Sequence, residues 1–231
     1  MPVISFVSSK GGVGKSTAAL VVAGEILDAG SNVTIIDADP NQPIVGWAEM
    51  TGPKKGLNVI GQVNEENIIP TIEKAATETA FVVIDLEGSA NMMVGYAISR
   101  SDLVIVPAQA SFLDGEGAAA AINLIDRTAD AFKTKVDKAV LLSRTSAAVQ
   151  PRILKQLQEM FAEGGVDVFK VQMIDRAAFR AIFAYGGTVH DLKTSEISNL
   201  DAAKDNAAAF IEEVIARLNP DLVKADREVA A

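Results

Sequence analysis

Cysteine is absent from this chain of 231 residues, and so are long apolar runs. Without thiols the chain can form no disulfide framework, no thiolate metal site and no iron–sulfur cluster. No apolar stretch approaches the roughly 20 residues that a membrane-spanning helix requires. Met1 leads straight into an apolar run, without the regions of a signal peptide. We therefore expect a protein of the bacterial cytoplasm.

Aromatic residues are also scarce, at 5% of the chain, although 49% of the residues are hydrophobic. A core of Val, Ile, Leu and Ala is typical of parallel strands covered by helices. Lys and Arg number 21 against 30 Asp and Glu, which gives a net charge of −9. Strong non-specific DNA binding relies on Lys and Arg neutralising phosphates, so this balance counts against it. A local basic patch stays possible.

Apolar runs alternate with helical patterns along nearly the whole sequence. The predicted strands are Val3–Val7, Val33–Asp37, Leu57–Ile60, Phe81–Asp85, Leu103–Val106, Ala139–Ser143 and Val166–Lys170. The predicted helices are Ser16–Ala29, Pro43–Met50, Glu65–Glu78, Asn91–Ser99, Gly115–Phe132, Pro151–Glu163, Arg176–Tyr185 and Ile197–Leu218. The alternation predicts an α/β fold, with one doubly wound parallel sheet and helices on both faces. We expect one domain over residues 1–218 and a charged tail over residues 219–231 that frays.

A glycine-rich loop, Ser-Lys-Gly-Gly-Val-Gly-Lys-Ser-Thr over residues 9–17, lies between the first predicted strand and helix. Glycines let backbone N–H groups turn toward an anion, and the helix N-terminus adds partial positive charge. Lys15 would reach the β- and γ-phosphates of a nucleotide, and Ser16 would offer a hydroxyl to Mg²⁺. The predicted nucleotide-binding residues of the loop are Gly11, Gly12, Val13, Gly14, Lys15, Ser16 and Thr17.

Carboxylates follow two of the predicted strands. Asp37 and Asp39 end the second strand, and Asp85 ends the fourth. Ligands bind at the carboxyl edge of an open parallel sheet, and an Asp at the end of such a strand holds Mg²⁺ in phosphate-binding proteins. For the first two acids, capping of the next helix is the alternative.

The loop resembles the deviant Walker A motif, Lys-Gly-Gly-x-Gly-Lys-Ser/Thr, of the ParA/MinD family of ATPases. Asp-Ala-Asp-Pro at residues 37–40, with Gln42 nearby, resembles that family's Walker A′ motif. The resemblance covers nearly the whole chain and implies a short ParA-like partition or positioning ATPase without an N-terminal helix-turn-helix. It implies a single-domain P-loop fold, ATP and Mg²⁺ as cofactors, and slow hydrolysis.

The same resemblance assigns roles to single residues. It implies that Lys10 crosses a dimer interface to the nucleotide of the partner subunit. It implies that Asp39 polarises the attacking water, and that Asp37 supports the Mg²⁺ held by Ser16 and Asp85. Because all these groups are needed, the site would be complete only between two ATP-bound subunits.

Further residues downstream have alternative interpretations. The resemblance places Arg144 and Asp175 near the adenine, where Arg144 stacks on the base or contacts phosphate; a solvated arginine is the alternative. Pro107 is expected to end strand pairing. Asp114 either lies at the dimer interface or caps the helix that we expect to begin at Gly115. We expect Glu87 to face solvent rather than tune the water.

The resemblance implies an ATP-dependent dimerisation switch that positions or segregates DNA or other cargo. Its partners would be a second copy when ATP is bound, non-specific DNA on the nucleoid, and a ParB-like or other adaptor that stimulates the ATPase. Basic residues at Arg152/Lys155 and Arg176/Arg180 share helix faces by spacing. The alternatives are an ATPase that serves conjugation or positions protein clusters, a MinD-like membrane-cycling regulator and a P-loop metabolic enzyme. The acidic tail disfavours membrane binding.

Overall fold

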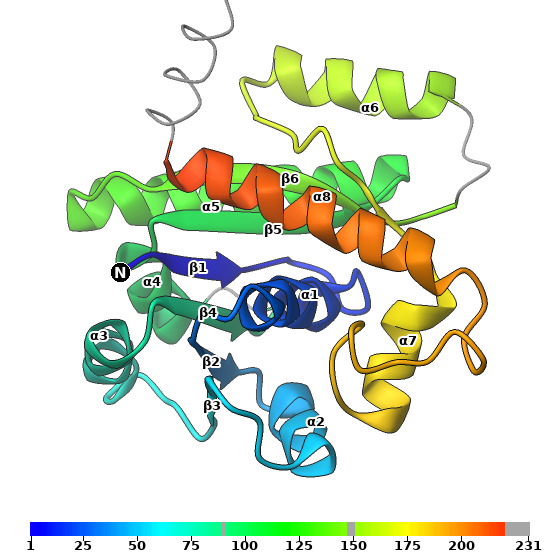
Figure 1. Ribbon diagram of the computed structural model, residues 1–231. Helices are drawn as coiled ribbons and strands as arrows, with labels where there is room; N and C mark the ends of the chain where they lie inside the picture. Colours follow the sequence, from blue (N-terminus) through cyan, green and yellow to red (C-terminus); the bar gives the residue numbers. More distant parts are fainter. Residues whose placement is uncertain (89–90, 147–150, 220–231) are drawn as a thin grey trace, which may run out of the picture.

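A seven-stranded sheet runs through the middle of the protein in the computed structural model, which describes residues 1–88, 91–146 and 151–219 (Figure 1). The strand order is β3-β2-β4-β1-β5-β6-β7, and every pair is parallel. The strands are β1 Val3–Phe6, β2 Val33–Ala38, β3 Leu57–Ile60, β4 Phe81–Leu86, β5 Leu103–Gln109, β6 Asp137–Thr145 and β7 Met173–Ile174. The predicted α/β fold with a parallel sheet is confirmed.

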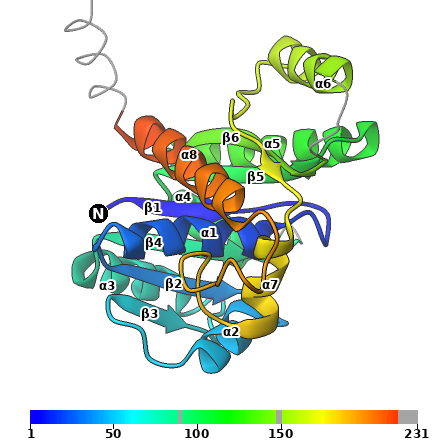
Figure 2. The same ribbon diagram turned by 45° about the vertical axis from the view of Figure 1, so that its right-hand side comes forward.

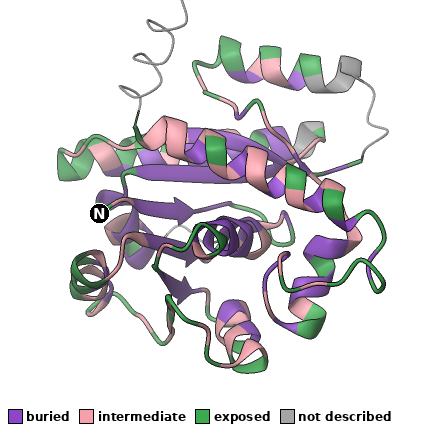
Figure 3. Cartoon of the chain, viewed as in Figure 1, coloured by how far each residue is buried: buried purple, intermediate pink, exposed green. Residues whose placement is uncertain are grey.

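Helices cover both faces of the sheet (Figures 1 and 2). They are α1 Lys15–Asp28, α2 Pro43–Thr51, α3 Ile68–Glu78, α4 Met92–Ser99, α5 Phe112–Phe132, α6 Pro151–Glu163, α7 Ala177–Tyr185 and α8 Leu200–Leu218. One apolar cluster joins α1, α2, α7 and α8 to the sheet, and a second cluster joins α3, α4, α5 and α6 to its other face. The central strands are accordingly buried along their whole length (Figure 3), as expected of parallel strands covered on both faces.

Pro107 does not end strand pairing, contrary to the prediction. β5 continues to Gln109, and Pro107 aligns with Leu141 of β6. The ladder between β1 and β5 ends at Phe6 and Ile105, followed only by the bond from Val7 N–H to the Ile105 carbonyl. Backbone groups of alternate residues in a strand face the same neighbouring strand. The backbone nitrogen of Pro107 therefore faces the side of β1, as the backbone of Ile105 does, but at a point where β1 has already ended. Its missing N–H therefore costs no ladder bond.

The predicted strand Val166–Lys170 is wrong, because this segment forms only one bridge, between Val168 and Val140. The backbone N–H groups of Lys170 and Val171 donate instead to the carboxylate of Glu213 on α8, both at 2.9 Å. These bonds turn the chain away from the sheet, and the seventh strand forms later, as β7.

Two helix starts show how side chains set the boundaries. Asn91 caps α4, since its side chain accepts from the N–H of Val94 at 2.8 Å. Ser111 caps α5, which begins three residues before the predicted start, so the alternative that Asp114 is the cap is wrong. At the other end, α8 ends at Leu218 as predicted, while residues 220–231 of the expected tail lie outside the described residues. Within those described residues no helix is both long and apolar enough to cross a membrane.

Candidate nucleotide-binding site

The glycine-rich loop connects β1 to α1 at the carboxyl edge of the sheet. Gly12 and Gly14 adopt φ of 76° and 96°, a left-handed backbone that glycine adopts without steric cost. Gly14 is the N-cap of α1, and its carbonyl accepts from the N–H of Ala18 at 2.9 Å. The helix N-terminus therefore faces the loop, an arrangement that binds phosphates elsewhere.

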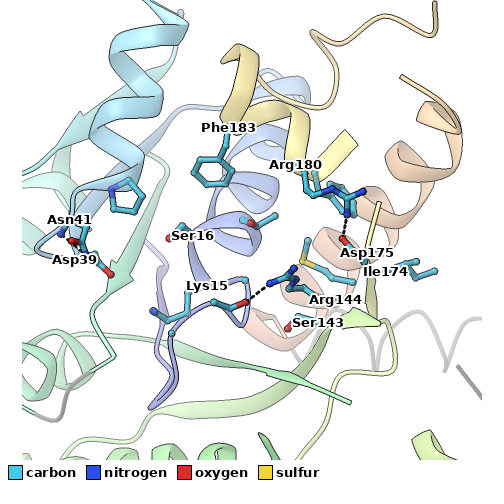
Figure 4. Close-up of a pocket in the computed structure, with 17 residues that line it drawn as sticks. Lys15, Ser16, Asp39, Asn41, Ser143, Arg144, Ile174, Asp175, Arg180 and Phe183 are labelled. Atoms are coloured by element: carbon cyan, nitrogen blue, oxygen red, sulfur yellow. Dashed lines mark hydrogen bonds and ion pairs between the residues drawn. The ribbon is translucent and has the colours of Figure 1, made fainter. Parts of the chain in front are cut away.

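A cavity of about 550 Å³ opens beside the loop (Figure 4). One half is lined by the loop, the start of α1 and the segment after β2; the other half by the ends of β6 and β7 and by α7. The lining residues are Gly11, Gly12, Gly14, Lys15, Ser16, Thr17, Asp39, Asn41, Pro43, Ser143, Arg144, Met173, Ile174, Asp175, Phe179, Arg180 and Phe183. The cavity thus joins the glycine-rich loop to a wall that carries apolar side chains, so the phosphates and the base of a nucleotide both have candidate contacts.

Asp85 lies fully buried at the end of β4, next to the loop. Ser16 donates its hydroxyl to Asp85 Oδ2 at 2.5 Å, while Asp85 Oδ1 has no hydrogen-bond partner among the described residues. Burial raises the pKa of Asp85 to about 7, against the bond from Ser16 and the charge of Lys15. A buried carboxylate with a free oxygen beside a hydroxyl is a fitting pair of Mg²⁺ ligands, so these residues fit the expected metal.

Asp37 aligns with Asp85 in the ladder between β2 and β4. Its Oδ2 accepts from the N–H groups of Ile44 and Val45, at 2.7 and 2.9 Å, in the first turn of α2. The helix-capping alternative is therefore confirmed for this residue. Burial raises the pKa of Asp37, although these backbone bonds oppose the rise. Its predicted part in the Mg²⁺ shell stays a prediction.

Asp39 is half-buried and lines the cavity, and its role in orienting water stays a prediction. The backbone N–H and the side-chain Nδ2 of Asn41 both donate to its Oδ1, at 2.9 and 3.0 Å. Figure 4 shows the two side chains together on the α2 side of the pocket. One carboxylate oxygen is thereby oriented by the residue two positions on, a contact that the sequence analysis missed.

Lys10 does not extend freely from the loop. Its Nζ lies 2.7 Å from Asp114 Oδ1 in the first turn of α5. Burial acts against ionisation of Asp114, but the bonds from Lys10 and Ser111 hold its pKa below the usual range. The lysine that is expected to act on a partner subunit is thus paired within its own chain.

The N-terminal end of α5 packs closely on two neighbours. Ser9 donates its hydroxyl to the carbonyl of Gly117 at 2.9 Å, and a Cβ at Gly117 would lie 3.0 Å from that hydroxyl. On another side, a Cβ at Gly115 would lie 2.7 Å from the terminal methyl of Met160 on α6. This end of α5 therefore touches both the phosphate loop and α6.

Arg144 and Asp175 both line the cavity, as predicted. Arg144 adopts a left-handed φ of 51°, and its guanidinium donates to the carbonyl of Gly12 at 2.8 Å. Asp175 forms an ion pair with Arg180 of α7 at the rim. Arg144 is exposed to solvent while it contacts the loop, and the predicted contacts of both residues with adenine stay a prediction.

Other side chains of the cavity were not foreseen. Phe179 and Phe183 form its apolar wall on α7, and their spacing of four on a predicted helix was the available signal. Ser143 donates to the carbonyl of Val13 at 2.5 Å. Ser143 ends a predicted strand at the carboxyl edge of the sheet, and this position was a signal for a site residue.

Residues outside the cavity have structural partners. His190 Nε2 lies 2.7 Å from Glu25 Oε1. Burial raises the pKa of Glu25, against the contact with His190. Glu87 is half-buried and accepts a hydrogen bond from Asn91, so the expectation that it faces solvent is wrong.

Several of the late basic residues are also ion-paired. Lys155 pairs with Glu159, Arg180 with Asp175, Lys193 with Glu196 and Arg217 with Asp167. Arg176 is the N-cap of α7, so it precedes the helix on which the sequence placed it with Arg180. The side chain of Arg152 lies outside the described residues. These pairings offset part of the positive charge of the late basic residues that the structure describes.

Similar proteins match nearly the whole chain. A family model described as VirC1 protein matches residues 1–224. Protein ParA of Rhizobium radiobacter is 34% identical over 222 residues, 96% of this chain and 100% of the relative. A putative plasmid partition protein from Borrelia burgdorferi B31 bound to AMPPNP matches with a TM-score of 0.64 at 18% identity, covering 92% of this chain and 99% of that one. A ParA family ATPase from Chlorobium tepidum TLS gives 0.68 at 16% identity, covering 90% and 98%.

Proposed function

The chain belongs to the VirC1 protein family, and from this premise we propose that it is an ATPase whose nucleotide state controls dimerisation. It hydrolyses ATP slowly, and the ATP-bound dimer engages DNA or another cargo. The similarity to Protein ParA over the full length of that relative supports a function of the partition type. The Borrelia burgdorferi partition protein bound to AMPPNP supports ATP as the nucleotide.

The contact between Ser16 and Asp85 carries this proposal. It places a hydroxyl and a buried carboxylate with one free oxygen directly beneath a loop built for phosphates. Mg²⁺ bound there would neutralise phosphate charge, with Ser16 and Asp85 holding it and Asp37 close by. The backbone N–H groups of the loop and the Lys15 ammonium would hold the phosphate oxygens.

Water activation falls to Asp39 in this proposal. Asn41 fixes one oxygen of its carboxylate, which leaves the other to orient a water toward the terminal phosphate. Such catalysis works by positioning and electrostatics, without a covalent step on the protein. Lys10 of the second subunit would add positive charge at the transferring phosphoryl, as an arginine finger does.

Lys10 must leave Asp114 to act in this way, because the two are paired within one chain. Dimerisation would therefore exchange an intramolecular ion pair for a contact with the partner's nucleotide. A partner protein that favours this exchange would stimulate hydrolysis, which is how a ParB-like or other adaptor fits the scheme.

Cargo is tested by co-sedimentation of the protein with DNA in the presence of ATP, of ADP and of no nucleotide, alongside ATPase assays. We expect DNA binding with ATP alone and DNA-stimulated hydrolysis. Hydrolysis without DNA binding in any state would assign the protein to a protein cargo instead. Absence of nucleotide binding would refute the ATPase itself.

A further inference from the structure

Three side chains at the carboxyl ends of β5 and β6 hold carbonyl oxygens of the phosphate loop. Arg144 Nη1 donates to the Gly12 carbonyl at 2.8 Å, and Gln109 Nε2 donates to the same oxygen at 3.4 Å. The buried Ser143 hydroxyl donates to the Val13 carbonyl at 2.5 Å. Two successive carbonyls of the loop are therefore held from the sheet.

We propose that Ser143 and Arg144 are positioning residues that preset the anion-binding N–H groups of the loop, and that Arg144 does not bind the base. This inference rests on the proposed nucleotide-binding function. In this proposal two strands that are distant from the loop in sequence keep the phosphate loop ordered.

Peptide geometry supplies the argument. The C=O and N–H of one trans peptide unit point in opposite directions. Holding the Gly12 carbonyl therefore directs the N–H of Val13 away from β6, and holding the Val13 carbonyl does the same for the N–H of Gly14. Positive φ at Gly12 and Gly14 provides the backbone alternation of a concave row of N–H groups.

The energetic benefit is preorganisation. A loop whose peptide units rotate freely must be ordered when the anion binds, and this cost lowers affinity. Donors that are already aligned need no reorganisation. The left-handed backbone of Arg144 carries a steric cost, yet in this conformation its guanidinium reaches the loop carbonyl, as Figure 4 shows.

The base is left to other side chains. Phe179 and Phe183 on α7 and Ile174 of β7 line the opposite end of the cavity. Arg144 also lines the cavity, and its Nη1 donates to the Gly12 carbonyl of the loop. A role in phosphate binding through the loop therefore fits its contacts better than stacking on the base.

Isothermal titration calorimetry with Mg²⁺ tests this with two probes, ADP and inorganic pyrophosphate, the second of which has no base. Ser143→Ala and Arg144→Met should each lower the affinity for both probes by about tenfold. The factor should be the same for ADP and for pyrophosphate. Gln109→Leu should have a smaller effect, because its bond is longer. The double variant of Ser143 and Arg144 should lose less than the product of the single losses, since both hold one loop.

Controls separate positioning from other roles. Arg100→Met removes an exposed arginine that pairs with Glu73 and should leave both affinities unchanged. Ser143→Thr keeps the hydroxyl and should retain parental affinity. Each variant should melt within about 2 °C of the parent when ligand-free, so that the loss is one of binding rather than folding.

Three outcomes would overturn the inference. If Arg144→Met weakens ADP but not pyrophosphate, Arg144 binds the base. If it weakens both while Ser143→Ala weakens neither, Arg144 contacts phosphate directly by its charge. In any other case in which Ser143→Ala binds both probes as tightly as the parent, the strands do not hold the loop in its binding conformation. Failure of the parent protein to bind either probe would instead refute the proposed function.

Discussion

Lys10 is the residue on which hydrolysis should depend while binding does not. Because the lysine is expected to reach the partner's nucleotide rather than its own, Lys10→Ala should leave the affinity for ATP within about twofold. Turnover should fall by at least about 100-fold, since a comparable arginine finger is worth more than that. Nucleotide titration and phosphate release measure the two effects.

Lys74→Ala, at an exposed lysine of α3 that pairs with Glu78, is the matched control and should behave like the parent. Equal turnover in Lys10→Ala and the parent would contradict the role in trans.

Asp85 should make the ligand-free protein less stable as pH rises. Burial raises its folded pKa to about 7 from an ordinary value of 3.8, so the folded state retains a proton that the unfolded state has released. The contribution of Asp85 to the free energy of unfolding is fully present below about pH 4 and is lost as pH rises through 7. The full difference is about 4 kcal/mol.

Chemical denaturation of the parent and of Asp85→Asn, in EDTA and without nucleotide, measures this dependence. Asparagine carries no titratable charge, so the variant should lose the slope and gain stability relative to the parent above pH 7. Asp130→Asn, at an exposed position of α5, should retain it. Parallel pH curves for the parent and Asp85→Asn would rule out the buried carboxyl as the cause.

For single residues, the sequence predicted the positions around the site better than the contacts that each side chain makes there. The loop and the carboxylates lie where motif spacing placed them, because strands that end at one sheet edge must bring their last residues together. Asp37 illustrates the limit: its bonds to Ile44 and Val45 depend on how α2 returns to the sheet, and no local pattern encodes that angle.

Among the elements, the segment that follows α6 is held by side chains of α8, of which Glu213 accepts from two successive backbone N–H groups. Glu213→Ala should destabilise the protein by about 2 kcal/mol, because the N–H groups of Lys170 and Val171 lose their charged acceptor. Hydrogen exchange at those two amides should accelerate as well.

Glu212→Ala, at the exposed neighbouring position, is the matched control for denaturation and exchange. If exchange at residues 170 and 171 is equally fast in both variants, the Glu213 carboxylate does not hold this segment.

Most elements were predicted within a few residues, because buried parallel strands and amphipathic helices have strong patterns. The failures arose where tertiary contacts override local preference. Residues 166–170 have the composition of a strand, but their ladder stops after Asp167 and Phe169 bond to Val140, because Glu213 of α8 accepts from Lys170 and Val171. Pro107 stays within β5 because the neighbouring strand is shorter, a fact that β5 alone does not contain.

For the whole molecule, Asp39→Ala should bind ATP and remain a dimer. Without the carboxylate that orients water, the nucleotide should persist and hold two subunits together. Size-exclusion chromatography with light scattering should give twice the 24.3 kDa of one chain. Lys15→Ala should stay monomeric, because it loses a phosphate ligand. Asp39→Ala that binds ATP and elutes as a monomer would contradict the switch.

The N-terminal end of α5 has a mechanical consequence. Gly115 and Gly117 place its backbone against Met160 on one side and Ser9 on the other. At these two contacts the helix offers backbone, so adjustment between the elements falls to the side chains of Ser9 and of the flexible Met160. We expect that part of a Ser9 displacement which these side chains do not absorb to reach α6. A fluorophore on the outer face of that helix would measure how much of it arrives when the loop is occupied.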